Sequence, residues 1–213
     1  MDDDGKLDAR EFHFLNEVAT GPRPLAHRLS ASGRKWLKAI EGLRLMPYDD
    51  GTGQPVEEWR RGATIGYGHL ILPAEWERFR NGIDQQWAES LLRFDLRDVE
   101  HSVVQRFRDC PCLQGRSERG LQQHEFDALV ILAFNIGAGA LNLSSVAAMI
   151  CEAPDVRIPY TELESAWMAW RWSDGEELEG LIRRRAGEWR IFCSADYALP
   201  LPQVLSTSSR LAE

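Results

Sequence analysis

Residues 41–69 read EGLRLMPYDDGTGQPVEEWRRGATIGYGH, and this stretch decides how the rest of the chain is interpreted. It places one carboxylic acid, Glu41, at the end of a helical pattern and a second, Asp50, on a polar turn. Thr64 opens a short apolar run that is punctuated by two glycines. A protonated carboxyl group at a helix end, facing an ionised carboxylate on a hairpin, suits the cleavage of a glycosidic bond.

The segment before this stretch, residues 32–41, has the apolar spacing of an amphipathic helix. Ser30 or Ser32 is a suitable N-cap for it. Glu41 therefore lies near the last helical turn, beside the apolar face. Partial burial disfavours the charged form of a carboxyl group, which would keep a proton available for general acid catalysis.

After Glu41 the helical spacing is lost, and two strand-like segments follow at residues 43–48 and 64–70. A turn signal rich in Asp and Gly separates them, so we predict a β-hairpin or a small three-stranded sheet. The long charged tip between the strands, residues 53–63, centres on Trp59. Loops on a rigid scaffold often carry function, and Trp59 is a candidate substrate contact.

The chain after Pro73 is predicted to be helical. Residues 84–106 form a long amphipathic pattern with Asp84 as its N-cap. Residues 123–136 are apolar on almost every face and stop at Gly137, which predicts a buried central helix. Shorter helices are predicted at residues 140–150, 161–172 and 176–193.

The first residues match part of a calcium-binding loop. An EF-hand loop has oxygen ligands at alternate positions, a Gly at its sharp turn and a Glu at its last position. Asp2, Asp4, Asp8 and Glu11 fit four of these ligand positions, and position one would precede Met1. These residues are candidate ligands of a weak Ca²⁺ site, and the match suggests that the chain is a piece of a longer protein. The alternative is a solvated, acidic helix start.

The chain divides into three parts. Residues 1–31 are an N-terminal appendage that ends in a linker containing Gly and Pro, and residues 32–196 form the folded domain. Residues 197–213 form a tail with prolines and a Ser/Thr run, which we expect to be loosely held.

Composition disfavours several classes of protein and site. A net charge of −8 would repel nucleic acid and anionic membranes. No window approaches eighteen uninterrupted apolar residues, and the N-terminus is acidic where a signal peptide is basic, so we expect neither a membrane span nor a signal peptide. We expect no zinc in the folded domain, and ordinary thiols rather than disulfides at all four cysteines: Cys110, Cys112, Cys151 and Cys193.

Four segments together resemble the phage-type lysozymes, the muramidases of glycoside hydrolase family 24. They are EGLRLMPYDDG (41–51), TIGYGHL (64–70), FDALVILAFNIGAG (126–139) and GLIRRRAGEW (180–189), in the family's order. The resemblance implies a lysozyme-like α+β fold, mostly helical, with a small sheet lobe beside the active-site cleft. It also implies a peptidoglycan hydrolase that needs no cofactor and cleaves the β-1,4 bond between N-acetylmuramic acid and N-acetylglucosamine.

The resemblance assigns three catalytic roles. Glu41 is the general acid, and Asp50, nine positions later, is the base or an electrostatic support. Thr64 holds the attacking water, which implies inversion. One feature departs from the family, because fourteen positions separate Asp50 from Thr64 where about six are common. If the additional residues shifted the strand register, Thr64 would be the first assignment to fail.

The resemblance also indicates supporting residues. Tyr48 and Tyr67 are expected to contact the substrate together with Trp59, and His69 is expected to form a structural ion pair with Asp95. One of three adjacent arginines is expected to approach the general acid from the last helix: Arg183, Arg184 or Arg185.

Two rival functions remain open at this point. A lytic transglycosylase would use a single acidic residue, and a cell-wall-binding or calcium-responsive module would use none. For the favoured reading, the expected partners of a monomer are peptidoglycan glycan strands and an immunity protein. The protein would act in the bacterial periplasm or cell wall after delivery by a secretion apparatus or a holin-type route. Its acidic balance and calcium motif favour the C-terminal lytic domain of a secreted antibacterial effector over a free phage endolysin.

Overall fold

The structure is a computed structural model that describes residues 28–108, 110, 113, 120–152, 158–173 and 175–200. The calcium ligands predicted at Asp2, Asp4, Asp8 and Glu11 lie outside the described residues, and so do Cys112 and almost all of the predicted appendage and tail. These predictions therefore stay predictions.

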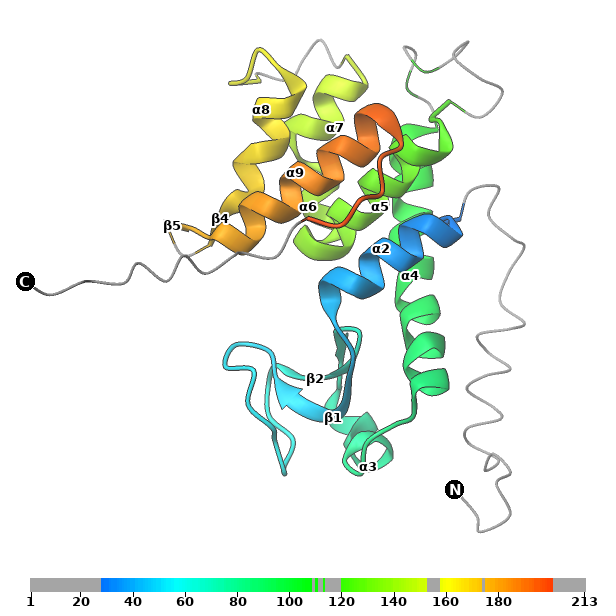
Figure 1. The fold of residues 1–213 in the computed structure, drawn as a ribbon, viewed down its shortest axis with the longest axis vertical. Coiled ribbons are helices and arrows are strands. Elements are labelled where there is room, and N and C mark those ends of the chain that lie inside the picture. The colour runs from blue at the N-terminus through cyan, green and yellow to red at the C-terminus, as the bar shows by residue number, and fades with distance from the viewer. Residues whose placement is uncertain are drawn as a thin grey trace, which may run out of the picture.

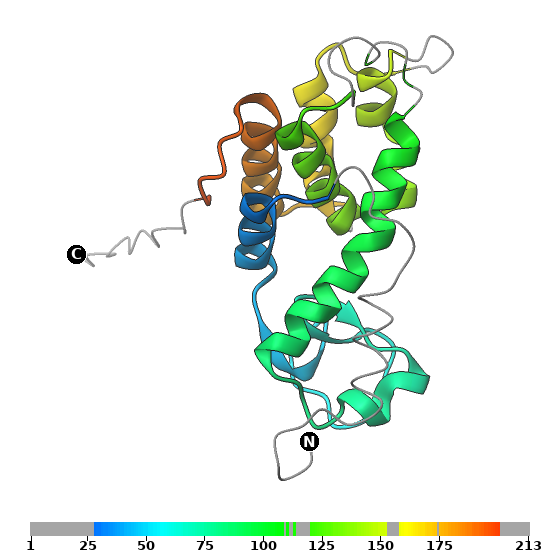
Figure 2. The same cartoon turned by 90° about the vertical axis from the view of Figure 1, so that its right-hand side faces the viewer.

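A helical lobe and a small sheet lobe lie toward opposite ends of one long helix, α4 (Gln85–Phe107) (Figures 1 and 2). The sheet lobe holds β1 (Arg44–Asp49), β2 (Ala63–Gly66), β3 (His69–Leu70), the 3₁₀ turn η1 (Pro73–Glu75) and α3 (Trp76–Phe79). The helical lobe holds α2 (Ala31–Glu41), α5 (Gln123–Ile136), α6 (Ala138–Asn142), α7 (Ser145–Ile150), α8 (Leu163–Met168), η3 (Ala169–Arg171), β4 (Trp172–Ser173), β5 (Glu176–Glu177) and α9 (Glu179–Ser194). This arrangement confirms the predicted α+β fold.

Helix α2 begins and ends at strong local signals. Ser30 is its N-cap and accepts a hydrogen bond from the Gly33 amide at 3.0 Å, while Gly42 ends it with a φ of +71°. Asp127 of α5 fixes the start of the helix, because its carboxylate accepts hydrogen bonds from the Ser30 amide and hydroxyl. Glu41 is thereby held at the last position of an anchored helix.

The core centres on α5, where eight consecutive residues (126–133) are buried. Helices α4 and α9 both pack against it. Helix α9 also approaches α2 closely at Gly187, where an added Cβ would lie 2.7 Å from Cζ2 of Trp36. This close approach brings the inner face of α9 next to α2. Among the described residues, no helix is both long and apolar enough to cross a membrane.

The sheet is antiparallel in the order β1–β2–β3. Tyr48 pairs with Thr64, and Ile65 pairs with His69. The register of β1 against β2 is interrupted once, between Arg44 and Tyr48. All four residues of β2 are buried, so this strand connects the sheet to the core.

Three helix predictions are wrong in detail. Residues 140–150 are divided between α6 and α7, because the Ser144 hydroxyl accepts a hydrogen bond from the Ala147 amide at 3.1 Å and starts a new helix. Residues 161–172 do not form one helix either, because the α-helix stops at Met168 and Trp172 lies in the short strand β4. That strand pairs with β5 in a hairpin that the sequence pattern did not predict, so the helix predicted at residues 176–193 begins only at Glu179.

The expectation of four ordinary thiols is wrong for two cysteines. Cys110 and Cys151 form a disulfide, with their Cα atoms 5.0 Å apart. The two residues are 41 positions apart, and they meet because the end of α4 and the end of α7 converge. Sequence spacing does not reveal this convergence. Cys193 is a free, exposed thiol.

Candidate active site

Glu41 is the last residue of α2, the helix whose C-terminal end leads into β1 (Figure 1). Its side chain is 19% exposed, and its Oε1 accepts a hydrogen bond of 2.7 Å from Nη2 of Arg184. Within the described residues, Oε2 has no hydrogen-bond partner. One oxygen of the carboxyl group is therefore fixed, and the other is available to a ligand.

The base of the β1–β2 hairpin brings Asp50 and Thr64 together. Tyr48 pairs with Thr64, and extending this antiparallel register by two positions puts Asp50 opposite Gly62. The Asp50 amide and the Thr64 hydroxyl both donate to the carbonyl oxygen of Gly62, each at 3.0 Å. Side chains two positions apart on a strand share one face of the sheet, so this register places Asp50 and Thr64 on the same face.

The Thr64 hydroxyl has a defined orientation. Its proton is directed at the Gly62 carbonyl, which leaves the lone pairs of Oγ1 to accept a hydrogen bond from another group, such as a water molecule. The residue is 3% exposed, so only a small part of its surface is open to a ligand. A buried hydroxyl with a fixed proton is suited to orienting one molecule of water.

The two adjacent aspartates have different environments. The carboxylate of Asp49 accepts hydrogen bonds from the amide and the hydroxyl of Thr52, at 2.9 and 3.1 Å. The Thr52 amide, followed by the Thr52 hydroxyl, lowers the pKa of Asp49. Asp50 is exposed, and its carboxylate accepts no hydrogen bond from the described residues. Asp49 therefore stabilises the turn, while the carboxylate of Asp50 is free to react.

The additional residues between Asp50 and Thr64 form a compact arm, which we define as residues 51–62. Its first half folds back along the free edge of β1: the Asp49 amide donates to the Gln54 carbonyl at 2.8 Å, and the Val56 amide donates to the Pro47 carbonyl at 3.1 Å. The arm therefore packs along β1, and at its base the Asp50 amide donates to the Gly62 carbonyl.

Tyr48 lies within electrostatic reach of both candidate catalytic carboxylates. Burial is the main cause that raises the pKa of its phenol, and the negative charges of Asp50 and Glu41 raise it further. Arg44, whose guanidinium carbon lies 4.6 Å from the centroid of the Tyr48 ring, acts in the opposite direction. Glu41 and Asp50 thus act on one side chain, although they come from different lobes.

The other two predicted substrate contacts differ in exposure. Trp59 is 40% exposed, and its Nε1 donates to the Ile71 carbonyl at 2.9 Å, which fixes the indole on the arm. Tyr67 is only 5% exposed, and the Lys38 amine lies 5.4 Å from its ring centroid. A ring so deeply buried offers little surface to a glycan. Substrate contact by Trp59 and Tyr67 stays a prediction.

His69 and Asp95 join β3 to α4. Nδ1 of His69 lies 2.9 Å from Oδ1 and 3.1 Å from Oδ2 of Asp95. Nε2 of His69 is buried, lies 4.0 Å from Oε2 of Glu75, and has no hydrogen-bond partner in the described part of the chain. This geometry is that of a structural contact between the sheet and the long helix.

Among the three adjacent arginines, the one that contacts Glu41 is Arg184. Arg183 instead pairs with Glu179, and Nη2 of Arg185 donates to the side-chain oxygen of Asn135. Sequence reasoning missed a further charged residue beside these arginines, Glu188 of α9. Its signal was the spacing of three and four positions from Arg185 and Arg184, which puts all three side chains near one face of a helix.

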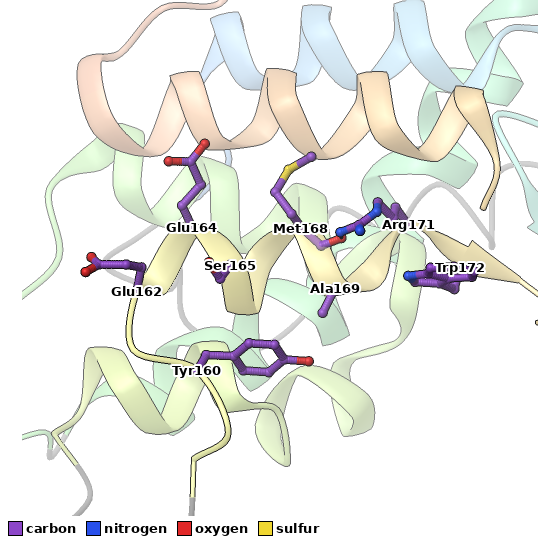
Figure 3. A pocket seen from close by; sticks show the side chains of 8 residues that line it. All are labelled: Tyr160, Glu162, Glu164, Ser165, Met168, Ala169, Arg171 and Trp172. Carbon is purple, nitrogen blue, oxygen red and sulfur yellow. The ribbon is translucent and has the colours of Figure 1, made fainter. Parts of the chain in front are cut away.

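A separate groove of about 580 Å³ runs along α8 (Figure 3). In Figure 3 the Tyr160 ring lies across from the face of the helix that carries Ser165 and Ala169, and Trp172 follows the end of the helix. Arg171 lies over the Trp172 ring and donates to Glu177, so its charge is engaged. The lining residues are Tyr160, Glu162, Glu164, Ser165, Met168, Ala169, Arg171 and Trp172, and they include none of the candidate catalytic residues. In the described ranges, no group of three or more His, Cys, Asp or Glu residues is arranged to hold a metal ion.

Comparisons with known proteins agree with this architecture. The model of the phage lysozyme family matches residues 38–188. The endolysin of Bacillus phage PZA is 33% identical over 171 residues, which cover 78% of this chain and 55% of that protein. The endolysin of Salmonella phage P22 is 30% identical over 169 residues, which cover 78% of this chain and 99% of that protein. The chain thus spans about half the length of some curated relatives and nearly all of others.

A solved structure, the muramidase domain of SpmX from Asticaccaulis excentricus, superimposes with a TM-score of 0.58. It is 32% identical in sequence, and the match covers 79% of this chain and 99% of that domain. The match extends over both the sheet lobe and the helical lobe, because neither lobe alone makes up that share of the chain.

Proposed function

Because the chain belongs to the phage lysozyme family, a family of glycoside hydrolases, we propose that it is a muramidase that hydrolyses peptidoglycan. The bond it cleaves is the β-1,4 link between N-acetylmuramic acid and N-acetylglucosamine. One observation carries the proposal for this chain. The end of α2 carries a carboxyl group, Glu41, that Arg184 anchors, and the base of the hairpin that follows carries a carboxylate, Asp50, that accepts no hydrogen bond from the described residues.

The reaction needs one proton donor and one proton acceptor on opposite sides of the sugar. Glu41 gives its proton to the glycosidic oxygen as the bond from that oxygen to the sugar carbon breaks. A water molecule adds to the same carbon from the other face and gives its proton to Asp50. Thr64 accepts a hydrogen bond from this water and orients it. Attack by water in a single displacement inverts the configuration at the carbon.

The test uses purified murein and three forms of the protein: the parent chain, Glu41→Gln and Glu57→Gln. Glu57 is exposed on the arm and serves as a matched control for loss of a carboxylate. We expect the parent and Glu57→Gln to release muropeptides with reducing N-acetylmuramic acid ends, and Glu41→Gln to release almost none. Equal release by Glu41→Gln would contradict catalysis by Glu41.

The products also separate the two enzyme classes. A lytic transglycosylase closes the muramic acid ring on itself and leaves 1,6-anhydro ends, which mass spectrometry distinguishes from hydrolysed ends by the mass of one water. The free carboxylate of Asp50 and the oriented hydroxyl of Thr64 favour the hydrolase, because a transglycosylase uses neither. Anhydro ends in the parent digest would contradict the proposal.

Action on the cell wall follows from the proposed substrate. The delivery route, the immunity protein and the monomeric state expected from the sequence stay predictions.

A further inference from the structure

Four charged side chains are buried together where α9 meets α2, and we call them the glutamate–arginine cluster: Glu41, Arg184, Arg185 and Glu188. Arg185 and Glu188 are fully buried, Arg184 is 8% exposed and Glu41 is 19% exposed. Two carboxylates face two guanidinium groups, so the charges balance when all four are ionised. Charges removed from water need such partners, and losing one partner leaves the others unpaired.

Glu188 is the centre of the cluster. Its Oε1 accepts hydrogen bonds from Nε of Arg184 at 3.2 Å and from Nη2 of Arg185 at 2.9 Å. Its Oε2 accepts one from Nε1 of Trp167 at 3.1 Å. Burial raises the pKa of Glu188, and the two arginines together with the indole act against that effect. Both carboxylate oxygens are therefore used, and the side chain has no freedom to turn.

Two nitrogen atoms of the rigid Arg184 guanidinium group are held by hydrogen bonds. Its Nε donates to Glu188, and its Nη2 donates to Oε1 of Glu41 at 2.7 Å. A guanidinium group is planar and delocalised, so fixing the direction of Nε also fixes the direction of Nη2. We propose that Glu188 is a positioning residue for Glu41. It has no hydrogen bond to Glu41, but through Arg184 it sets the orientation of the general acid.

Glu188 also balances the charge that Glu41 faces. Glu41 accepts a hydrogen bond from Arg184. It also interacts electrostatically with Arg185 and with the phenol of Tyr48, which belongs to the sheet lobe. If Glu188 loses its charge, the two cations are balanced by Glu41 alone. The loss of Glu188 therefore changes both the hydrogen bonding of Arg184 and the charge balance around the carboxyl group of Glu41. This inference rests on the proposed function, because it concerns the acid of that reaction.

The experiment compares Glu188→Gln with a matched control, Glu100→Gln. Glu100 is a buried glutamate on α4 that accepts hydrogen bonds from the Leu29 amide at 2.8 Å and from Arg28 at 3.1 Å. For each variant, kcat and KM on soluble murein fragments are measured between about pH 4 and pH 9, per folded molecule as determined by circular dichroism.

We expect Glu188→Gln to lower kcat roughly tenfold or more with KM nearly unchanged, because small misplacements of a catalytic group cost large factors in rate. Glu100→Gln is expected to lower the thermal midpoint without changing kcat. A parent-like kcat in folded Glu188→Gln would overturn the inference.

If Glu188→Gln does not fold, Glu188→Asp replaces it. Aspartate keeps the charge but withdraws the carboxylate by one methylene group, so kcat is expected to fall while KM stays nearly unchanged. A kcat equal to that of the parent would overturn the positioning role. A parent chain that releases no muropeptides would instead contradict the proposed function, and that result is obtained before any Glu188 variant is compared.

Discussion

Asp50 and Thr64 are joined through a single atom, the carbonyl oxygen of Gly62, which accepts a hydrogen bond of 3.0 Å from the amide of the first and another from the hydroxyl of the second. The aspartate main chain and the threonine side chain therefore cannot shift independently. For an inverting hydrolase this matters, because the base and the group that orients the water must act on the same molecule.

Replacing Thr64 tests the role of its hydroxyl. Thr64→Val keeps the shape and the burial of the side chain but removes the oxygen, and it is expected to lower kcat about 100-fold, because the attacking water is then no longer held in position. Thr64→Ser keeps the oxygen and should retain most of the activity. The measurement is the initial rate of murein hydrolysis per folded molecule. Parent-like activity in Thr64→Val would remove Thr64 from the mechanism.

The two aspartates are separable by substitution. Asp50→Asn is expected to abolish hydrolysis at an almost unchanged thermal midpoint, because the carboxylate of Asp50 accepts no hydrogen bond from the described residues. Asp49→Asn is expected to keep hydrolysis and to lower the thermal midpoint, since Asp49 holds Thr52. Measuring hydrolysis and the thermal midpoint of both variants and of the parent shows which aspartate is the base. If the outcomes were exchanged, Asp49 would be the base.

The contribution of Asp49 to stability should depend on pH. The pKa of Asp49 is lowered below its ordinary value of 3.8, so the folded state releases this proton more readily than the unfolded chain. The stabilisation is present above pH 3.8 and is lost as the pH falls through the lowered value. The difference in thermal midpoint between the parent and Asp49→Asn should therefore be full near neutral pH and should shrink in acid. A difference that grows in acid would contradict this.

The contact between His69 and Asp95 is expected to support the fold and not the chemistry. Asp95→Asn weakens a partly buried hydrogen bond, and we expect it to reduce the free energy of unfolding by about 1–3 kcal/mol. Chemical denaturation measures this loss, and kcat per folded molecule should stay within about twofold of the parent. A large loss of kcat at parent-like stability would indicate that His69 takes part in the reaction.

Reduction of the disulfide between Cys110 and Cys151 should destabilise the protein. The bond closes a long loop, and cross-links of this kind typically contribute about 2–4 kcal/mol. For a domain of this size that corresponds to roughly 5–15 °C in the thermal midpoint. Thermal unfolding with and without reductant measures the effect, and Cys193→Ser is the control for the remaining described thiol. An unchanged midpoint after complete reduction would contradict the assignment.

Local signals made much of the site predictable. Ser30 and Gly42 mark the ends of α2, so the position of Glu41 follows from residues within one helix. A longer arm between two paired strands need not move the strand ends that carry it. Asp50 and Thr64 could therefore be paired despite the length of the arm.

Other features depend on how distant segments meet. Arg183, Arg184 and Arg185 lie one position apart on a helix, and only the packing of α9 against α2 selects the one that contacts Glu41. Glu188 resembles an exposed partner in a helical ion pair, but the same packing buries it completely. The hairpin of β4 and β5 has strands of only two residues, too short for any periodic pattern.

The arm has one further consequence, for protein engineering. Its two ends are held together by the hydrogen bond from the Asp50 amide to the Gly62 carbonyl, whatever lies between them. The entropic cost of closing such a loop grows only slowly with its length. Glu57 and Glu58 are exposed and lie beyond the segment that hydrogen-bonds to β1, so foreign segments of different lengths can be grafted between them while the hairpin base stays constant.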